Sequence, residues 1–326
     1  MRILITGGAG YLGSVTSLLA LAQGHDVRVV DNLLHGATAL AALRAQNHFE
    51  FCRADICDQA AMAEAARDMD AVVHLAAIVG DPACSVEPDL ARKVNYDAAV
   101  QLFETCRRAG AKRFVFASTC SNYGRMADSS VPATEDFELR PVSLYAETKV
   151  AVERRLLQES EPGMTVTVLR FSTLFGLSPR MRFDLTVNEF VMRVLSEGRL
   201  VVYGEQFWRP YVHVSDAARA ILKVLEAPPE IVQRQVFNVG DTGENYRKLD
   251  LVEIIRDQLG EYDVKFVKRH EDPRDYRVSF ERIKNTLGYA ITRRVSEGVN
   301  EIAASIRSGA LHPLDDPQKY NTAPVT

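Results

Sequence analysis

Short apolar segments alternate with longer amphipathic segments through the first half of the chain. The apolar segments have strand length and are rich in Val, Ile and Phe, whereas the segments between them repeat apolar residues at helical spacing. The predicted strands cover residues 2–6, 26–30, 50–53, 71–75, 113–118 and 165–170, and the predicted helices cover residues 11–23, 59–69, 89–109 and 142–158. This alternation is typical of βαβ units with right-handed crossovers, so the expected fold class is α/β with a doubly wound parallel sheet.

The alternation of apolar and amphipathic segments becomes less regular after Gly176. Residues 177–184 are rich in Pro, Arg and Met and are expected to form a loop. The remaining predicted elements are helices at residues 187–197, 216–226 and 248–259 and a hairpin-like stretch at residues 200–211. This half is therefore expected to form a smaller, less regular C-terminal lobe. The tail from His312, which contains several Pro and Asp residues, is expected to be loosely ordered.

A glycine-rich turn directly follows the first predicted strand. Gly7, Gly10 and Gly13 form a G-x-x-G-x-x-G pattern in the run TGGAGYLG at residues 6–13. In dinucleotide-binding folds such glycines allow a sharp turn, a close approach of backbone to a pyrophosphate and close helix packing, while the helix N-terminus attracts the phosphates. Asp31 ends the second predicted strand, where a carboxylate can accept hydrogen bonds from the adenosine ribose and repel a 2′-phosphate. The pattern favours NAD over NADP; a structural turn and a solvated strand end are the alternative interpretations.

The run YAETK places Tyr145 and Lys149 four residues apart, on one face of the fourth predicted helix. The pKa of a free tyrosine is about 10, and lowering it by about three units takes roughly 4 kcal/mol. One cation about 4 Å away supplies about that amount at an effective dielectric constant near 20. Lys149 and the nicotinamide ring of NAD⁺ together are therefore expected to make Tyr145 a base at neutral pH, with an exposed helix face as the alternative. Ser118 ends the fifth predicted strand and Thr119 opens the polar loop after it, where a hydroxyl can reach the same pocket.

Composition limits the other classes of function. The chain has 326 residues, a formal net charge of −4 and no block of like charges, which argues against a protein that binds nucleic acid or a membrane surface. Its five cysteines form no CxxC pair and its seven histidines show no metal-ligand spacing, so reduced thiols and no dedicated metal ion are expected. No apolar run approaches the roughly 20 residues of a membrane span, and no signal peptide precedes the first strand. A cytoplasmic protein is expected.

The order of these motifs resembles the extended short-chain dehydrogenase/reductase family, which includes the nucleotide-sugar epimerases and dehydratases. The resemblance covers nearly the whole chain. Its motifs, in the family's order, are TGGAGYLG at 6–13, DN at 31–32, ADI at 54–56, HLAA at 74–77, VN at 94–95, STCSNYG at 118–124, YAETK at 145–149, RFSTLFG at 170–176, RPYVHVSD at 209–216 and LGY at 287–289. The family implies a NAD-binding Rossmann-type domain over residues 1–170, with a contribution from about 210–240, and a substrate lobe formed mainly by residues 171–326.

The resemblance also implies site residues, position by position. It gives Thr119, Tyr145 and Lys149 as the catalytic set. The residues implied to bind NAD are Gly7, Gly10, Tyr11, Leu12, Gly13, Asp31, Asn32, Asp55, Ile56, Leu75, Ala76, Ala77, Asn95, Ser118, Tyr145 and Lys149. Those implied to bind a nucleotide-diphosphate sugar are Thr119, Thr173, Asn188, Arg209 and Arg274. The two guanidinium groups suit a diphosphate, with a surface ion pair as the alternative for Arg274, and the family often has Asn at the position of Thr173.

Two residues depart from the dehydratases of the family. The dTDP-glucose 4,6-dehydratases carry an acid pair directly after the threonine, where this chain has Cys120 and Ser121. Neither side chain is a good acid for the elimination of water. Cys120 is interpreted as a small buried thiol, with a thiolate base as the alternative. His74, at a strand end, is interpreted as a structural histidine rather than a base.

The resulting hypothesis is a NAD-dependent epimerase of nucleotide-diphosphate hexoses that acts at C4 through a 4-keto sugar. The enzyme alternatives are a 4-ketoreductase or sugar-nucleotide dehydrogenase, and then a 4,6-dehydratase. The alternative from another class is a non-catalytic NAD-binding sensor. Such sensors commonly lack the tyrosine or the lysine, and both are present here. The family also implies a homodimer, formed by the helices predicted at residues 89–109 and 142–158.

Overall fold

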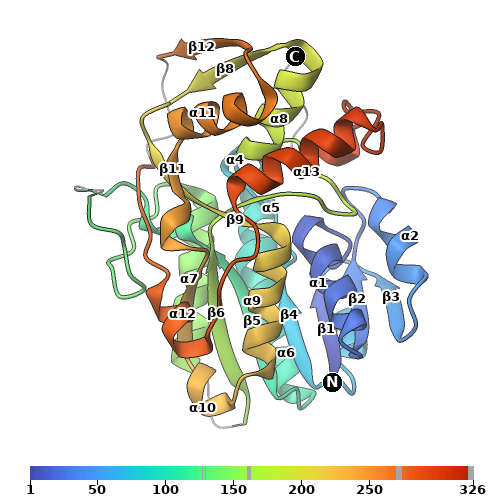
Figure 1. The fold of residues 1–326 in the computed structure, drawn as a ribbon. Helices are drawn as coiled ribbons and strands as arrows, with labels where there is room; N and C mark the ends of the chain where they lie inside the picture. The colour runs from blue at the N-terminus through green and yellow to red at the C-terminus, as the bar shows by residue number, and fades with distance from the viewer. Residues whose placement is uncertain (127, 129, 160–162, 269–273, 322–326) are drawn as a thin grey trace.

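The core of the molecule is a parallel β-sheet. The computed structural model describes residues 1–326 except 127, 129, 160–162, 269–273 and 322–326. Within these residues the sheet has seven strands, all parallel, in the order β10-β6-β5-β4-β1-β2-β3 (Figure 1). The strands are β1 (Arg2–Thr6), β2 (Asp26–Asp31), β3 (Phe49–Arg53), β4 (Ala71–His74), β5 (Arg113–Thr119), β6 (Thr165–Phe171) and β10 (Gln235–Val239). The direction of the crossovers reverses between β1 and β4, and in open α/β sheets the carboxyl ends of two such strands mark the ligand site.

Helices cover both faces of this sheet. α1 (Tyr11–Ala22) and α9 (Val214–Glu226) pack against each other on one face. α3 (Gln59–Ala65), α6 (Ala99–Arg108) and α7 (Leu144–Glu159) cover the other face. The predicted fold class, a doubly wound parallel sheet, is confirmed, and the six strands and four helices predicted for the first half are all present, with ends shifted by a few residues.

The helix predicted at residues 89–109 contains a π-helical segment. It consists of α5 (Pro88–Arg92), the π segment η1 (Lys93–Ala98) and α6. Asn95 lies in η1 and is buried, and its side-chain amide holds the backbone of Ile78: the Ile78 N–H donates at 2.8 Å and the Ile78 carbonyl accepts at 2.9 Å. π segments of this kind often occur at functional sites. Here the segment fixes the loop that follows β4.

The second lobe lies beyond the carboxyl ends of the sheet strands, at the top of Figure 1. Within the described residues it contains a three-stranded sheet in the order β11-β9-β7 and a two-stranded sheet of β12 and β8. The strands are β7 (Thr173–Phe175), β8 (Arg199–Tyr203), β9 (Trp208–His213), β11 (Asn245–Arg247) and β12 (Asp263–Val267). The main helices are α8 (Thr186–Glu197), α11 (Lys248–Leu259) and α13 (Val295–Arg307), which pack on one another over an apolar cluster of their own.

The prediction of a hairpin-like stretch at residues 200–211 is wrong. β8 and β9 are neighbours in the sequence, but β8 pairs with β12, whereas β9 lies between β7 and β11. The burial of the two strands differs: alternate residues of β8 are exposed, whereas almost every residue of β9 is buried. β8 therefore lies at the surface and β9 in the interior. An alternating pattern identifies a strand but does not select its partner.

The C-terminal tail is packed, contrary to the expectation of loose order. The Lys319 ammonium donates to the Leu311 carbonyl at 2.8 Å, and the Tyr320 hydroxyl donates to the Leu314 carbonyl at 3.0 Å. The Phe183 N–H donates to the Lys319 carbonyl at 2.8 Å, which attaches the tail to the 177–184 loop. Residues 322–326 of the tail lie outside the described residues. The tail up to Asn321 thus forms part of the second lobe.

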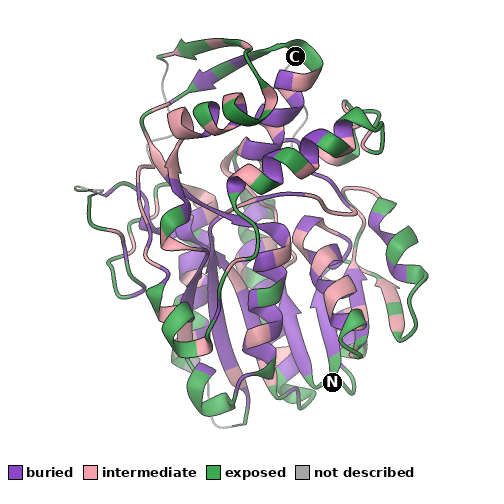
Figure 2. Cartoon of the chain, viewed as in Figure 1, coloured by how far each residue is buried: buried purple, intermediate pink, exposed green. Residues whose placement is uncertain are grey.

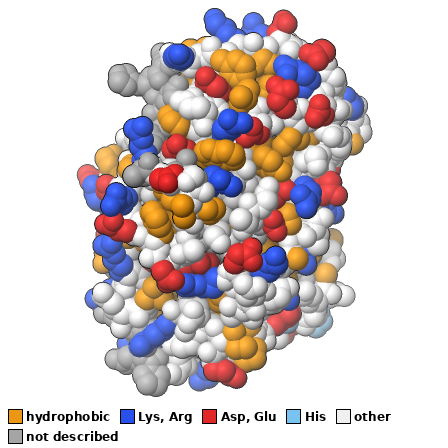
Figure 3. Space-filling view, turned by 60° about the vertical axis from the view of Figure 1, so that its left-hand side comes forward, with side chains coloured by type: hydrophobic (Ala, Val, Ile, Leu, Met, Phe, Trp, Pro, Cys, Tyr) orange, Lys and Arg blue, Asp and Glu red, His pale blue; other side chains and the backbone are white. Residues whose placement is uncertain are grey.

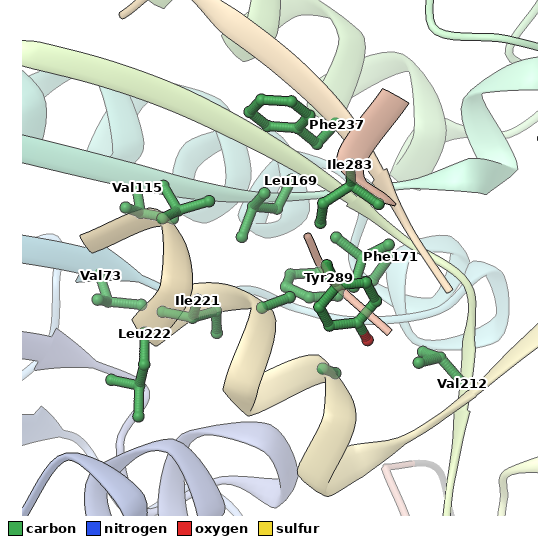
Figure 4. Close-up of a cluster of buried hydrophobic side chains, with 14 of the residues drawn as sticks. Val73, Val115, Leu169, Phe171, Val212, Ile221, Leu222, Phe237, Ile283 and Tyr289 are labelled. Atoms are coloured by element: carbon green, nitrogen blue, oxygen red, sulfur yellow. The ribbon is translucent and has the colours of Figure 1, made fainter. Parts of the chain in front are cut away.

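An apolar core between the sheet and α9 joins the two lobes. Figure 4 shows Val73 of β4, Val115 of β5 and Leu169 of β6 on the side of the sheet that faces Ile221 and Leu222 of α9. Phe237 of β10 lies beside Ile283 in the same cluster. Val212 from β9 and Tyr289, which follows α12 (Glu281–Leu287), extend this cluster toward the second lobe. The central sheet strands in Figure 2 are buried along most of their length, as expected for parallel strands covered on both faces, whereas the edge strand β3 is partly exposed. The floor of any site at the strand ends is therefore rigidly packed.

A buried ion pair lies directly behind the carboxyl end of β5. Glu153 of α7 and Arg170 of β6 form a bidentate salt bridge, with a shortest distance of 2.8 Å, and their side chains are 2% and 5% exposed. Ser118 also donates to the Glu153 carboxylate, as does the Asn122 amide at 2.7 Å. Arg170 donates further to the Tyr123 hydroxyl at 3.0 Å. The pair therefore connects α7 to β5, β6 and the turn after β5.

The outer surface is mixed in charge and carries no membrane span in the described part of the chain. On the face drawn in Figure 3, basic and acidic side chains are interspersed, with apolar side chains scattered between them. This fits the small net charge of −4. None of the described helices is both long and apolar enough to cross a bilayer.

We predict that Arg170→Met destabilises the protein by about 3–5 kcal/mol, because it leaves the Glu153 carboxylate buried without a countercharge. The free energy of unfolding from urea titration measures the loss. The double variant Glu153→Met/Arg170→Met removes both charges and should recover most of the stability. Arg199→Met, which breaks an exposed ion pair with Glu197, serves as the control, with an expected cost below about 1 kcal/mol. A loss for Arg170→Met no larger than that of the control would contradict the role assigned to this pair.

Candidate active site

A single continuous cavity of 690 Å³, bounded by described residues of both lobes, lies at the carboxyl ends of the sheet strands. Its walls include the glycine turn after β1, the ends of β2 to β6, the start of α7 and the 177–184 loop. This is the switch point between β1 and β4. The cavity has the size of a small-molecule site, and its lining includes cofactor residues as well as substrate residues predicted above.

The glycine turn has the close contacts that its sequence predicts. Gly7 has a φ of +72°, and a Cβ there would lie 2.8 Å from the backbone nitrogen of Ala76. A Cβ on Gly13 would lie 2.1 Å from the carbonyl oxygen of Gly7. Gly10 is the N-cap residue of α1, so no side chain caps the helix. The N–H groups of its first turn therefore remain available to an anion in the cavity.

Acidic side chains line the cavity at the ends of β2 and β3. Asp31 accepts hydrogen bonds from the backbone N–H groups of Ala9, at 3.0 Å, and Leu33, at 2.8 Å, while burial raises the pKa of its carboxyl. The Asn32 amide donates to the Asp55 carboxylate at 3.1 Å. The backbone N–H of Cys57 holds the pKa of Asp55 below its usual range. These carboxylates are oriented acceptors, as a ribose site requires.

Tyr145 and Lys149 lie together on α7, where both line the cavity. The Lys149 Nζ lies 5.8 Å from the centre of the Tyr145 ring, donates to the Ala117 carbonyl at 2.9 Å and sits 4.8 Å from the centre of the Phe116 ring. Burial lowers the pKa of Lys149 to about 8 and raises the pKa of Tyr145. Desolvation of the phenol is the largest effect on its pKa in the protein alone, so the lowered pKa expected from Lys149 and NAD⁺ together stays a prediction.

The turn after β5 presents hydroxyl groups to the cavity and hides the thiol. Thr119 and Ser121 line the cavity, and Thr119 accepts from the Ser121 N–H at 3.1 Å. Cys120 points away: it is 1% exposed and donates to the Arg170 carbonyl at 3.2 Å. Burial raises the pKa of the Cys120 thiol. This arrangement favours the interpretation of Cys120 as a structural thiol rather than a base.

His74 is also structural. It is 1% exposed, it stacks on Phe116 and its Nδ1 lies 2.7 Å from the Thr6 hydroxyl. Burial lowers the pKa of the imidazole to about 3, so the ring is neutral at physiological pH. No group of three or more His, Cys, Asp or Glu side chains suited to a metal ion occurs among the described residues.

The far end of the cavity carries arginines from the second lobe. Arg209, from β9, lies over the ring of Tyr276, with 5.2 Å from its guanidinium carbon to the ring centre. Arg274 pairs with Asp81 across the cavity at 3.0 Å and donates to the Ser121 hydroxyl at 3.1 Å. The ion pair that sequence offered as an alternative for Arg274 is thus present, but it lies inside the cavity rather than on the surface.

All but two of the site residues predicted from the sequence line this cavity, Thr173 among them. The exceptions are Asn95 and Asn188, which lie behind the wall. Asn95 holds Ile78, as described above. Asn188 is fully buried: it accepts from the Gly176 N–H at 3.0 Å and donates to the Tyr11 hydroxyl and to the Arg182 carbonyl. Its side chain is committed to internal contacts, and a direct role with substrate stays a prediction.

Several cavity residues were not predicted. Many of them come from loops whose course a sequence pattern does not specify, among them Leu34, His35, Gly36, Ile78, Val79, Gly80, Asp81, Pro82, Arg180, Arg182, Asp184, Tyr276 and Asn321. Others, such as Ala9, Ser121 and Leu174, adjoin residues that were predicted. The sequence indicates that irregular loops such as residues 80–88 and 177–184 shape the pocket, but it assigns no role to the two arginines of the PRMR run at residues 179–182. Their position depends on contacts between lobes that are distant in sequence.

Comparison with known proteins agrees with this geometry. The model of the NAD dependent epimerase/dehydratase family matches residues 3–240. A UDP-glucose 4-epimerase from Corynebacterium glutamicum is 29% identical, over 89% of this chain and 90% of that protein. A dTDP-glucose 4,6-dehydratase from an Actinoplanes species is 31% identical, over 94% of this chain and 98% of that protein.

The fold is shared with solved structures as well. The UDP-glucose 4-epimerase of Thermus thermophilus, in complex with NAD, superposes with a TM-score of 0.82 at 27% identity, over 94% of this chain and 99% of that chain. The turn geometry at Gly7 and Gly13, the uncapped N-terminus of α1 and the acceptors at Asp31 all fit such a dinucleotide. The chain therefore belongs to the NAD-dependent epimerase/dehydratase family, of the extended short-chain dehydrogenase/reductase type, and its cofactor is NAD.

Proposed function

We propose that this enzyme is a nucleotide-diphosphate-sugar 4-epimerase that acts through a 4-keto intermediate. The observation that carries the proposal is the chemistry at the catalytic end of the cavity. Tyr145, Lys149 and Thr119 converge there, and no carboxyl side chain follows Thr119. Such a set suits the removal and return of a hydroxyl proton, which is all that inversion at C4 asks of the protein.

Tyr145 is proposed as the group that holds and moves the proton. Its hydroxyl takes the proton of the sugar 4-hydroxyl as C4 is oxidised, and gives it back as the keto group is reduced. Thr119, at the end of β5, holds the same oxygen. Lys149, fixed by the Ala117 carbonyl and the Phe116 ring, places a positive charge near the phenol.

NAD, when bound, would supply the redox chemistry, namely the uptake of a hydride from C4 and its return to the opposite face. A positive charge brought into the site with it would also favour the phenolate of Tyr145. This matters because burial alone raises the pKa of Tyr145. The chain's own part is to bury the phenol and the lysine together, so that a charge brought close to them acts in a medium of low polarity.

Arg209 and Arg274 are proposed to bind the diphosphate of the sugar nucleotide. Both line the end of the cavity away from Asp31, next to Tyr276. Arginine suits this task because its planar group donates two parallel hydrogen bonds to a phosphate. Asp81, which holds Arg274 at 3.0 Å, keeps the guanidinium in place until a diphosphate competes for it.

Loss of water from the sugar requires a base at C5 and an acid at the C6 hydroxyl. Cys120 is buried against the Arg170 carbonyl, and Ser121 is a hydroxyl, so neither position supplies these groups. Among the described carboxylates of the cavity, Asp31 and Asp55 lie at the adenosine end, Asp184 is paired with Arg182, and Asp81 with Arg274. This supports epimerisation over dehydration.

The test is to incubate the purified protein, without added cofactor, with a panel of nucleotide-diphosphate hexoses and to follow the products by mass spectrometry and chromatography. The proposal predicts a product of unchanged mass that separates from its substrate. A product lighter by one water would show a dehydratase. A change of two hydrogens that stops without added NAD or NADH would show a one-way dehydrogenase or reductase, and either result would contradict the proposal.

We predict that Tyr145→Phe lowers the turnover of the identified substrate by about two to four powers of ten, the usual contribution of a positioned acid–base group. The NAD content of the purified protein should be unchanged, because the ring remains. Tyr203→Phe makes the same chemical change on the exposed face of β8 and is the control, with unchanged turnover. If Tyr145→Phe turned over as fast as this control, Tyr145 would be excluded as the base.

A further inference from the structure

Arg180 is a buried cation in the cavity wall that no step above uses. It is 2% exposed and belongs to the 177–184 loop of the second lobe. Ser178, two residues earlier, fastens this loop to the first turn of α1: its hydroxyl donates to the Tyr11 carbonyl at 2.7 Å and lies 3.1 Å from the Ser14 hydroxyl. The loop therefore carries Arg180 across the N-terminus of α1, from the opposite lobe.

The guanidinium of Arg180 has donors that the described protein does not satisfy. One terminal nitrogen donates to the Tyr320 carbonyl at 3.1 Å. Its Nε is buried and has no hydrogen-bond partner among the described residues. Asn321, the next residue of the tail, lines the same cavity, and its Oδ1 is likewise buried without a partner there. Buried donors without acceptors are costly, which points to an acceptor supplied by a ligand.

The charge of Arg180 is also poorly balanced. Its neighbour Arg182 forms a bidentate ion pair with Asp184, whereas in the described part of the chain Arg180 has no carboxylate within ion-pairing distance. Burial and the nearby Arg182 lower the pKa of Arg180 to about 10, and the opposing effects of Asp184 and Asp31 do not restore it. An anion in the cavity would offset this cost.

We propose that Arg180 binds the diphosphate of NAD, on the side opposite the free N–H groups of the first turn of α1. In the proposed complex the cavity holds two diphosphates, one from NAD and one from the sugar nucleotide. The residues around Arg180 indicate which of the two it contacts. Tyr11, Asp31 and His35 lie around it, whereas Arg209 and Arg274 lie at the substrate end. The inference rests on the cofactor of the family and not on which sugar is converted.

The tail holds Arg180 in this position. The Tyr320 carbonyl accepts from its guanidinium, and the Lys319 carbonyl accepts from Phe183, farther along the same loop. Gln318 packs against Gly36, in the loop after β2: a Cβ on Gly36 would lie 2.0 Å from its side-chain oxygen. The tail therefore bridges the second lobe and the adenosine end of the cavity, so the arginine is positioned before any ligand arrives.

The test compares Arg180→Gln, Arg180→Lys and the unmodified protein, with Arg193→Gln as the control that removes a positive charge from α8, outside the cavity. Bound NAD is removed, refolding is checked by circular dichroism, and NAD and ADP-ribose are titrated by calorimetry. Loss of one charge-assisted hydrogen bond corresponds to about a 10- to 100-fold rise in Kd. We expect this rise for Arg180→Gln with both ligands, a smaller rise for Arg180→Lys and none for Arg193→Gln.

A second titration, of UDP, dTDP and GDP into the NAD-loaded proteins, distinguishes the two diphosphates. The proposal predicts that Arg180→Gln leaves the affinity for these nucleotides essentially unchanged. It is overturned if Kd for NAD is unchanged in both Arg180 variants, or if nucleotide diphosphate binding is lost while NAD binding is kept. If Arg180→Gln does not fold, the Kd of Arg180→Lys for NAD tests the proposal, because this variant keeps the charge and loses the Nε donor. A rise in this Kd is then expected. Because the readout is binding, it is independent of whether the enzyme proves to be an epimerase.

Discussion

The buried pairing of Glu153 with Arg170 is the interaction on which the catalytic end of the molecule depends. Tyr145, Lys149 and Glu153 follow one another at intervals of four residues, so they share one face of α7. Glu153 anchors the far end of this row to β6 through Arg170, and to Ser118 at the end of β5. Both charges are almost fully buried, and each satisfies the other together with neighbouring donors. This network fixes α7, which carries Tyr145 and Lys149, against the end of β5, which carries Thr119.

The same burial governs the acid–base chemistry. Desolvation raises the pKa of Tyr145 and lowers the pKa of Lys149 to about 8, so the site by itself disfavours both a phenolate and an ammonium. A site of this kind responds strongly to a charge that is brought in. In the proposed mechanism a positive nicotinamide ring would favour the phenolate, which in turn would favour the ammonium. The proposed base would then depend on the cofactor.

The sheet and most of the cavity could be predicted because their signals are local. A strand followed by TGGAGYLG, or a helix that begins at YAETK, carries its residue pattern within a few turns of chain, and the parallel sheet brings all strand ends to one edge. The sequence did not predict the positions of segments that are set by contacts with residues distant in the chain. The alternation in β8 did not reveal that β12 is its neighbour, and the Pro and Asp of the tail did not reveal its contacts with Phe183 and Arg180. Arg180 itself is placed by Ser178 against α1, through a contact with Tyr11 that spans 167 positions of the sequence.

The central claim is that hydrogen leaves C4 and returns to C4 of the same sugar. The most direct measurement uses the identified substrate carrying deuterium at C4, in ordinary water, with the product examined by nuclear magnetic resonance. The account predicts that the epimerised product keeps the full deuterium label at C4, because the hydrogen stays in the closed site between removal and return. Loss of the label to water, or its appearance at C6 with loss of water from the sugar, would contradict the account.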